Sequence, residues 1–112
     1  MITGAHIMIY SHDAEADRAF FRDILGLDNV DAGYGWLIFR LPPSDVALHP
    51  SHDNDLHEVS LMCDDIESEI DRLSRAGVEC TPIQEQGWGR LTRLHLPGGG
   101  SLALYQPTHP RP

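Results

Sequence analysis

The sequence predicts an α+β domain made of two tandem βαβββ units. One reason is that two segments have a similar residue pattern. They are HIMIYSHDAEADRAFFRDILGL, which begins at His6, and HEVSLMCDDIESEIDRLSRAGV, which begins at His57. The same offset relates Asp13 to Asp64. A second reason is that FRLPPSDVALHP and LHLPGGGSLALYQP both place Leu-Pro before a turn and Ala-Leu after it. Two copies are too few to stack into a solenoid, so the repeat indicates one duplicated domain.

The two units take up almost the whole chain of 112 residues. We expect the first unit over about residues 4–50, a polar linker over 51–56 and the second unit over about 57–107. A frayed tail is expected over 108–112. A chain of this length forms one domain, 1–112, with a single hydrophobic core.

In the first unit, the β-branched and aromatic residues of AHIMIYS predict a strand. Asp13 then has the side chain of a helix N-cap, and the helix should run to about Leu25 because Gly26 follows as a natural stop. Strands are expected over YGWLIFRLP and DVALHP, with PPSD as the turn between them.

The second unit repeats this order. HEVSLMC predicts a strand, and a helix should run from about Asp65 to Ala76 with Ile66, Ile70 and Leu73 along one side. VECTPI, RLTRLHLP and SLALYQP predict three further strands, the last two joined by GGG.

Alternation along these strands sorts their residues onto two faces of the sheet. One face is nearly all aliphatic and should pack beneath the helices: Ile7, Ile9, Phe39, Leu41, Val46, Leu48, Ser60, Met62, Leu94, Leu96, Leu102 and Leu104. The opposite face mixes polar and apolar groups: His6, Met8, Tyr10, Arg40, Ala47, His49, His57, Val59, Leu61, Arg93, His95, Ala103 and Tyr105. The histidines gathered there favour a binding surface over a merely solvated one.

Composition excludes several classes of partner. A net charge of −9 and a pI near 5.0 argue against nucleic acid and anionic membranes. No apolar stretch is long enough to span a membrane, and the N-terminus lacks a signal pattern. Cys63 and Cys80 have neither disulfide-framework nor metal-type spacing. These features predict a cytoplasmic protein.

Paired βαβββ units that each open on a histidine resemble the vicinal oxygen chelate superfamily, which groups glyoxalases, bleomycin-resistance proteins and extradiol dioxygenases. The resemblance covers roughly residues 4–107. It implies a curved mixed sheet around a concave cavity, with helices on its convex side. It also implies a homodimer, because a second chain often completes the cavity in such proteins.

The resemblance further implies a metal site that takes one ligand from the first strand and one from the last strand of each unit. The first-strand positions fall at His6 and His57, but the last-strand positions fall at Ala47 and Ala103, which cannot coordinate. Two alternatives stay open: no metal, or one divalent ion (zinc, iron, nickel or manganese) held by the two histidines with non-standard further ligands. Glu58 is adjacent to His57, but alternation along the strand points its side chain to the other face of the sheet, so we do not expect it to be a metal ligand.

Ligand contacts are expected from apolar, aromatic and cationic side chains of the mixed face and of the loop EQGWGR: Met8, Tyr10, Arg40, His49, Trp88, Arg93, His95 and Tyr105. Arginines can hold an anionic group, and aromatic rings supply contact area. The glycines around Trp88 allow either a mobile lid over a ligand or a tight hairpin anchored by the tryptophan.

Three functions are compatible with these residues. The loss of both carboxylate positions favours a metal-free, small-molecule-binding protein of the bleomycin-resistance type. The alternative is a divalent-metal-dependent glyoxalase- or dioxygenase-like enzyme, a lyase or an oxidoreductase, that uses His6 and His57. A third is a metal-free lyase or isomerase with a histidine as general base. The residues do not identify the ligand or substrate.

Overall fold

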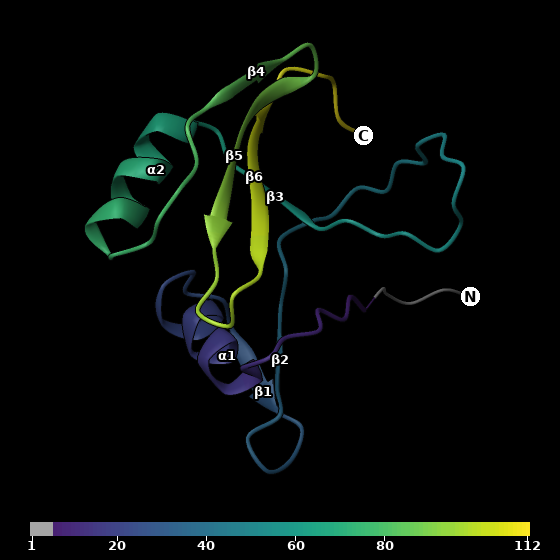
Figure 1. The fold of residues 1–112 in the computed structure, drawn as a ribbon. Helices are drawn as coiled ribbons and strands as arrows, with labels where there is room; N and C mark the ends of the chain where they lie inside the picture. The colour runs from purple at the N-terminus through teal and green to yellow at the C-terminus, as the bar shows by residue number, and fades with distance from the viewer. Residues whose placement is uncertain (1–5) are drawn as a thin grey trace.

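The computed structural model describes residues 6–112 and has the predicted α+β architecture, with two helices and two sheets in that part of the chain (Figure 1). In chain order the elements are α1 (Ala14–Asp23), β1 (Asn29–Asp31), β2 (Leu37–Phe39), β3 (Ser60–Met62), α2 (Ile66–Arg75), β4 (Gln84–Gln86), β5 (Gly89–His95) and β6 (Ser101–Pro107). The expected start of the first unit, residues 4 and 5, lies outside the described residues.

The second unit forms the complete βαβββ order that its sequence predicts. Its four-stranded sheet has the order β3-β6-β5-β4, and it is mixed because β3 runs parallel to β6 while the other pairs are antiparallel. The long hairpin of β5 and β6 pairs residues from Gly89↔Pro107 to His95↔Ser101. The strand expected over VECTPI is reduced to an isolated bridge between Cys80 and Leu94, and β4 starts after it.

The first unit is less regular than its sequence predicts. It contains α1 and a two-stranded antiparallel ladder of β1 and β2, of which β1 was not foreseen. Residues 6–11 and 45–50, where two strands were expected, lie outside any strand, so those two predictions were wrong. A strand is stable when its N–H and C=O groups pair with a neighbour, and no strand among residues 6–112 pairs with these segments.

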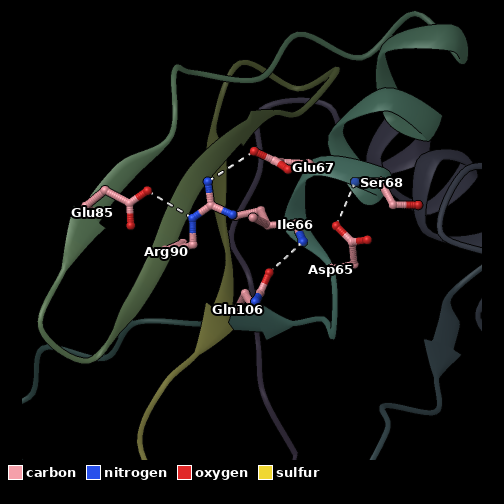
Figure 2. Close-up of polar contacts among 7 residues, drawn as sticks. All are labelled: Asp65, Ile66, Glu67, Ser68, Glu85, Arg90 and Gln106. Atoms are coloured by element: carbon pink, nitrogen blue, oxygen red, sulfur yellow. Dashed lines mark hydrogen bonds and ion pairs between the residues drawn. The ribbon is translucent and has the colours of Figure 1, made fainter.

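Both helices begin as predicted. The Asp13 carboxylate accepts a hydrogen bond from the backbone N–H of Ala16 at 3.1 Å, and the Asp65 carboxylate accepts one from Ser68 at 3.1 Å (Figure 2). Each cap satisfies one of the N–H groups that a helix start leaves without an intrahelical partner. After α2, Gly77 has a φ of +84°, a value that glycine adopts without steric cost.

The core lies between the two helices and one face of the β5–β6 hairpin. Phe20 of α1 and Leu73 of α2 pack with four leucines of the predicted aliphatic face: Leu94, Leu96, Leu102 and Leu104. Burying each of these side chains stabilises the fold by about 1.5–3 kcal/mol. Val46 and Leu48 were expected on the same face, but they are 89% and 92% exposed because their segment forms no strand.

The N-terminus of α2 is fastened to the sheet by side chains (Figure 2). The Gln106 side-chain oxygen on β6 accepts the N–H of the fully buried Ile66 at 3.0 Å. Arg90 on β5 pairs with Glu85 at 2.9 Å and with Glu67 of α2 at 3.2 Å. These contacts fix α2 against the end of the hairpin.

The C-terminal tail has no regular structure, but it is not the frayed end we expected. The Thr108 N–H donates to the Trp88 carbonyl at 3.0 Å, and Arg111 forms an ion pair with Asp45 at 2.8 Å. The tail therefore lies back against the hairpin and the first unit. Neither helix in the described part of the chain is long and apolar enough to cross a membrane.

Candidate functional site

A cavity of about 330 Å³ opens beside β3, β5 and β6. Residues 8–10, 57–60 and 101–103 line it, together with Arg93 and Leu96. Its walls therefore come from both units: from the segment before α1, from the entry to β3, and from the end of the hairpin.

Four of the predicted site residues meet in this cavity: Met8, Tyr10, His57 and Arg93. Arg93 stands directly opposite Ala103 in the ladder of β5 and β6, so its side chain rises where the neighbouring strand has only a methyl group. Its Nε donates a hydrogen bond to the Ser101 hydroxyl at 3.0 Å, which orients the guanidinium along the cavity wall.

Arg93 has no carboxylate partner among the residues that the structure describes. Five other arginines form ion pairs: Arg22, Arg72, Arg75, Arg90 and Arg111. In a chain with a net charge of −9, a cation that faces a cavity without an acidic partner is a natural site for an anionic group.

His57 and Glu58 both line the cavity, which corrects the expectation that Glu58 would point away. Alternation requires regular strand geometry, and these two residues lie before β3 begins at Ser60. The cavity therefore carries one imidazole, one carboxylate and one guanidinium.

Trp88 and Tyr105 lie outside this cavity and contact one another. Trp88 occupies the turn between β4 and β5, and its ring meets that of Tyr105 edge-on at 5.2 Å between centroids. Of the two interpretations of this loop, the structure shows the tight hairpin with an anchored tryptophan.

The other predicted contacts are dispersed. His95 lines a second cavity of about 380 Å³ near the end of α1, and its Nδ1 lies 3.4 Å from a Glu79 carboxylate oxygen. His6, Arg40 and His49 are exposed and line neither cavity.

Comparison with known proteins identifies the family. The sequence model of the Glyoxalase/Bleomycin resistance protein/Dioxygenase superfamily matches residues 4–99. The chain belongs to this superfamily. The resemblance seen in the sequence is therefore confirmed. No curated protein matches the chain.

Solved structures of the superfamily share the fold. TnmS3, an antibiotic-binding protein from Streptomyces sp. CB03234, is 23% identical with a TM-score of 0.68 over 96% of this chain and all of its own. A glyoxalase/bleomycin resistance protein from the same organism is 25% identical with a TM-score of 0.60 over 84% of this chain and 91% of its own. The fosfomycin resistance protein FosX of Listeria monocytogenes is 17% identical with a TM-score of 0.66, over 96% and 94% of the two chains.

The metal site implied by the superfamily does not fit the residues present. Between residues 6 and 112, no three His, Cys, Asp or Glu side chains are grouped so that they could hold an ion. His57 lines the cavity while His6 does not, and Ala47 and Ala103 offer no donor atom. The assignment of a metal to His6 and His57 stays a prediction.

Neither thiol is suited to act as a nucleophile in this superfamily member. Burial, together with the nearby carboxylates of Glu69 and Asp64, raises the pKa of Cys63 to about 11. Burial also raises the pKa of Cys80. Both groups are therefore protonated at neutral pH.

Sequence reasoning did not place six of the residues that line the cavity: Ile9, Glu58, Ser60, Leu96, Ser101 and Leu102. Alternation assigned Ile9, Ser60, Leu96 and Leu102 to the aliphatic face, and Leu96 and Leu102 are buried core residues that border the cavity. The sequence did hold a signal for Ser101: it directly follows the GGG turn, which places it at the end of the hairpin. The structure pairs it there with His95, the last residue of β5.

Proposed function

We propose that the chain is a small-molecule-binding protein of the glyoxalase/bleomycin-resistance type, and that its ligand places an anionic group against Arg93 and an apolar body against Met8 and Ile9. The observation that carries the proposal is the guanidinium of Arg93, which has no carboxylate partner within residues 6–112 and lies in a cavity lined by both units.

The size and lining of the cavity support this proposal. About 330 Å³ lies at the lower end of the range of small-molecule sites. Val59 adds apolar surface to the same cavity. A hydrogen bond to a charged group contributes about 1.5–3 kcal/mol, so Arg93 would select for acidic ligands. The antibiotic-binding relative makes an antibiotic-like molecule a reasonable candidate.

Two dyes of similar shape test the proposal. 8-Anilinonaphthalene-1-sulfonate carries an anionic sulfonate, and N-phenyl-1-naphthylamine lacks it. We expect Arg93→Gln to weaken binding of the sulfonate at least tenfold in a fluorescence titration, and to leave the neutral dye unchanged. Arg75→Gln, on the exposed side of α2, is the matched control. Equal loss of both dyes, or no loss with Arg93→Gln, would contradict the proposal.

We further propose that the protein is a homodimer. Val46 and Leu48 are almost fully exposed, and Ile7, Met8 and Ile9 are about half exposed. The radius of gyration of 14.9 Å exceeds the roughly 13 Å of a compact domain of this length. A second copy would cover these apolar side chains, several of which lie beside the cavity.

Light scattering on a sizing column tests the dimer. We expect twice the chain mass for the natural protein, and a monomer for Leu48→Glu. Ser74→Glu adds the same charge to an exposed position of α2 and should leave the dimer intact. A natural protein that elutes with the mass of one chain would refute the assignment.

An enzymatic function keeps one structural support, since His57 and Glu58 line the cavity together. Elemental analysis of protein purified without a histidine tag decides whether a metal takes part. Stoichiometric zinc, iron, nickel or manganese that is lost in His57→Ala would favour the metal-dependent enzyme.

We also propose a cytoplasmic location, which the free thiols of Cys63 and Cys80 support because disulfides are rare in the cytoplasm.

A further inference from the structure

We propose that Trp88 and Tyr105 form a second binding site, here called the aromatic platform, for a flat nitrogen heteroaromatic group, and that the chain's own His109 occupies it in the free protein. The aromatic platform lies outside the cavity assigned above. The proposal is therefore independent of the function proposed for that cavity.

The geometry of the three rings defines the site. Trp88 meets Tyr105 at 82° between ring planes, so it forms a side wall and does not cover the tyrosine face. The imidazole of His109 lies 5.9 Å from the Tyr105 ring, tilted by 37°. Offset or tilted aromatic contacts of this kind are favourable beyond the area that they bury. A flat ring is thus already held on the aromatic platform, and it comes from the chain itself.

The hydrogen bonds of His109 show which ring chemistry the aromatic platform accepts. Its Nδ1 lies 2.8 Å from the Pro110 carbonyl oxygen, which can only accept, so Nδ1 carries the hydrogen. In the neutral imidazole, Nε2 is then the acceptor, and the Tyr105 hydroxyl donates to it at 3.2 Å. The matching ligand is a flat ring with an acceptor nitrogen at its edge, such as an azole or a pyridine.

The tail is held on both sides of His109 by contacts that can open. Thr108 donates to the Trp88 carbonyl at 3.0 Å, and Arg111 pairs with Asp45 at 2.8 Å. The tail has no regular secondary structure and is largely exposed, which places it among the segments that open at low cost. A ligand for the aromatic platform must therefore displace His109, and its apparent affinity falls by the fraction of molecules in which the tail is open.

Benzimidazole and indole are matched probes for this site. Both are flat bicyclic rings with an N–H, and benzimidazole adds the acceptor nitrogen. The chain has two tryptophans, so its NMR spectrum has two indole N–H signals; Trp36 lies in the first unit under Arg18 and serves as an internal reference. We expect benzimidazole to shift the Trp88 signal and not the Trp36 signal. Because His109 competes, His109→Ala should bind benzimidazole about tenfold more tightly than the natural chain.

Four variants complete the test. Arg111→Ala removes the ion pair that holds the tail and should also tighten benzimidazole binding, whereas Arg75→Ala should not. In the His109→Ala background, Tyr105→Phe should abolish the preference for benzimidazole over indole. The proposal is overturned if benzimidazole fails to shift Trp88 in His109→Ala, if His109→Ala binds no more tightly than the natural chain, or if indole binds equally well. Arg93→Gln should leave this titration unchanged, which separates the aromatic platform from the cavity.

Discussion

A buried carboxylate joins the two units, and removing it should measurably destabilise the protein. Asp17 of α1 is 9% exposed, and one of its oxygens accepts the N–H of Gly98 in the β5–β6 turn at 2.7 Å. Figure 1 shows that this turn lies next to α1. A hydrogen bond to a charged group contributes about 1.5–3 kcal/mol. Asp17→Ala should therefore lower the free energy of unfolding by about 2 kcal/mol, after allowing for the better helix propensity of alanine.

For a domain of this size, that loss corresponds to a fall in Tm of about 8 °C. The assay is thermal and urea unfolding followed by circular dichroism. Glu15→Ala is the matched control, because Glu15 lies in the same first turn of α1 but is exposed. Both variants remove an acidic group from the helix start, and only Asp17→Ala removes the bond to Gly98.

A double-mutant cycle sharpens the test. A Cβ on Gly98 would overlap the Ser11 hydroxyl and lie 2.7 Å from the second oxygen of Asp17. Gly98→Ala alone should cost about 1–3 kcal/mol through this crowding. In the Asp17→Ala background the carboxylate is gone, so the same substitution should cost about 1 kcal/mol less. Strictly additive effects, or an Asp17→Ala loss no larger than that of Glu15→Ala, would refute the reasoning.

Three further results are expected. Cys63, with its pKa of about 11, should react with iodoacetamide about a hundredfold more slowly at pH 8 than a thiol of ordinary pKa 9.0, because only the thiolate reacts. A plot of the reaction rate against pH with its midpoint at or below 9 would contradict this. The hydrogen bond from Arg111 holds the pKa of Asp45 below its ordinary 3.8, so the stability that this pair contributes is present above pH 3.8 and is lost as the pH falls through the lower pKa of the folded state. A carbon NMR titration should show the pKa of Asp45 rising in Arg111→Ala, and an unchanged pKa would argue against the pairing. Gln106→Ala should cost about 1–3 kcal/mol in urea unfolding because the N–H of buried Ile66 loses its partner, and a loss under 0.5 kcal/mol would argue against that bond.

The second unit could be predicted from its sequence because several local signals agree there. Leu94, Leu102 and Leu104 alternate with polar or small residues, and glycines mark the turn between the two strands. Asp65 stands where a helix must start, three residues before the N–H that it caps. Each signal depends on a few neighbouring residues, so no distant contact was needed to read it.

The first unit shows what such signals cannot decide. Residues 6–11 and 45–50 have the composition of strands, but a strand also needs a neighbour with free N–H and C=O groups in register. The β1 strand, by contrast, follows from a turn: the Asp31 carboxylate accepts the N–H of Gly33 at 2.8 Å in the sequence DAGYGW. That aspartate and its two glycines were a usable signal for a hairpin.

Part of the candidate site could be predicted from local strand patterns, but the residues that lie outside regular strands could not. Alternation placed Arg93 and Ala103 on one face, and the ladder of β5 and β6 sets them opposite one another. It failed for Glu58, which precedes its strand. Contacts between residues far apart in the chain, such as that of Asp45 with Arg111, leave no pattern in a single sequence.

The unequal regularity of the two units has a consequence for binding. One wall of the cavity, formed by Arg93 and residues 101–103, belongs to the hydrogen-bonded hairpin. The opposite wall includes Met8 and Tyr10, in a segment that has no strand partner among the described residues. If a second copy supplies that partner, it orders one wall of each cavity, and dimer formation then changes ligand affinity. Linkage requires the reverse as well: a ligand that binds the dimer tenfold more tightly than the monomer must strengthen dimerisation by the same factor for each site that it fills. Sedimentation of the dimer with and without a bound dye would therefore report on the cavity, even before its natural ligand is known.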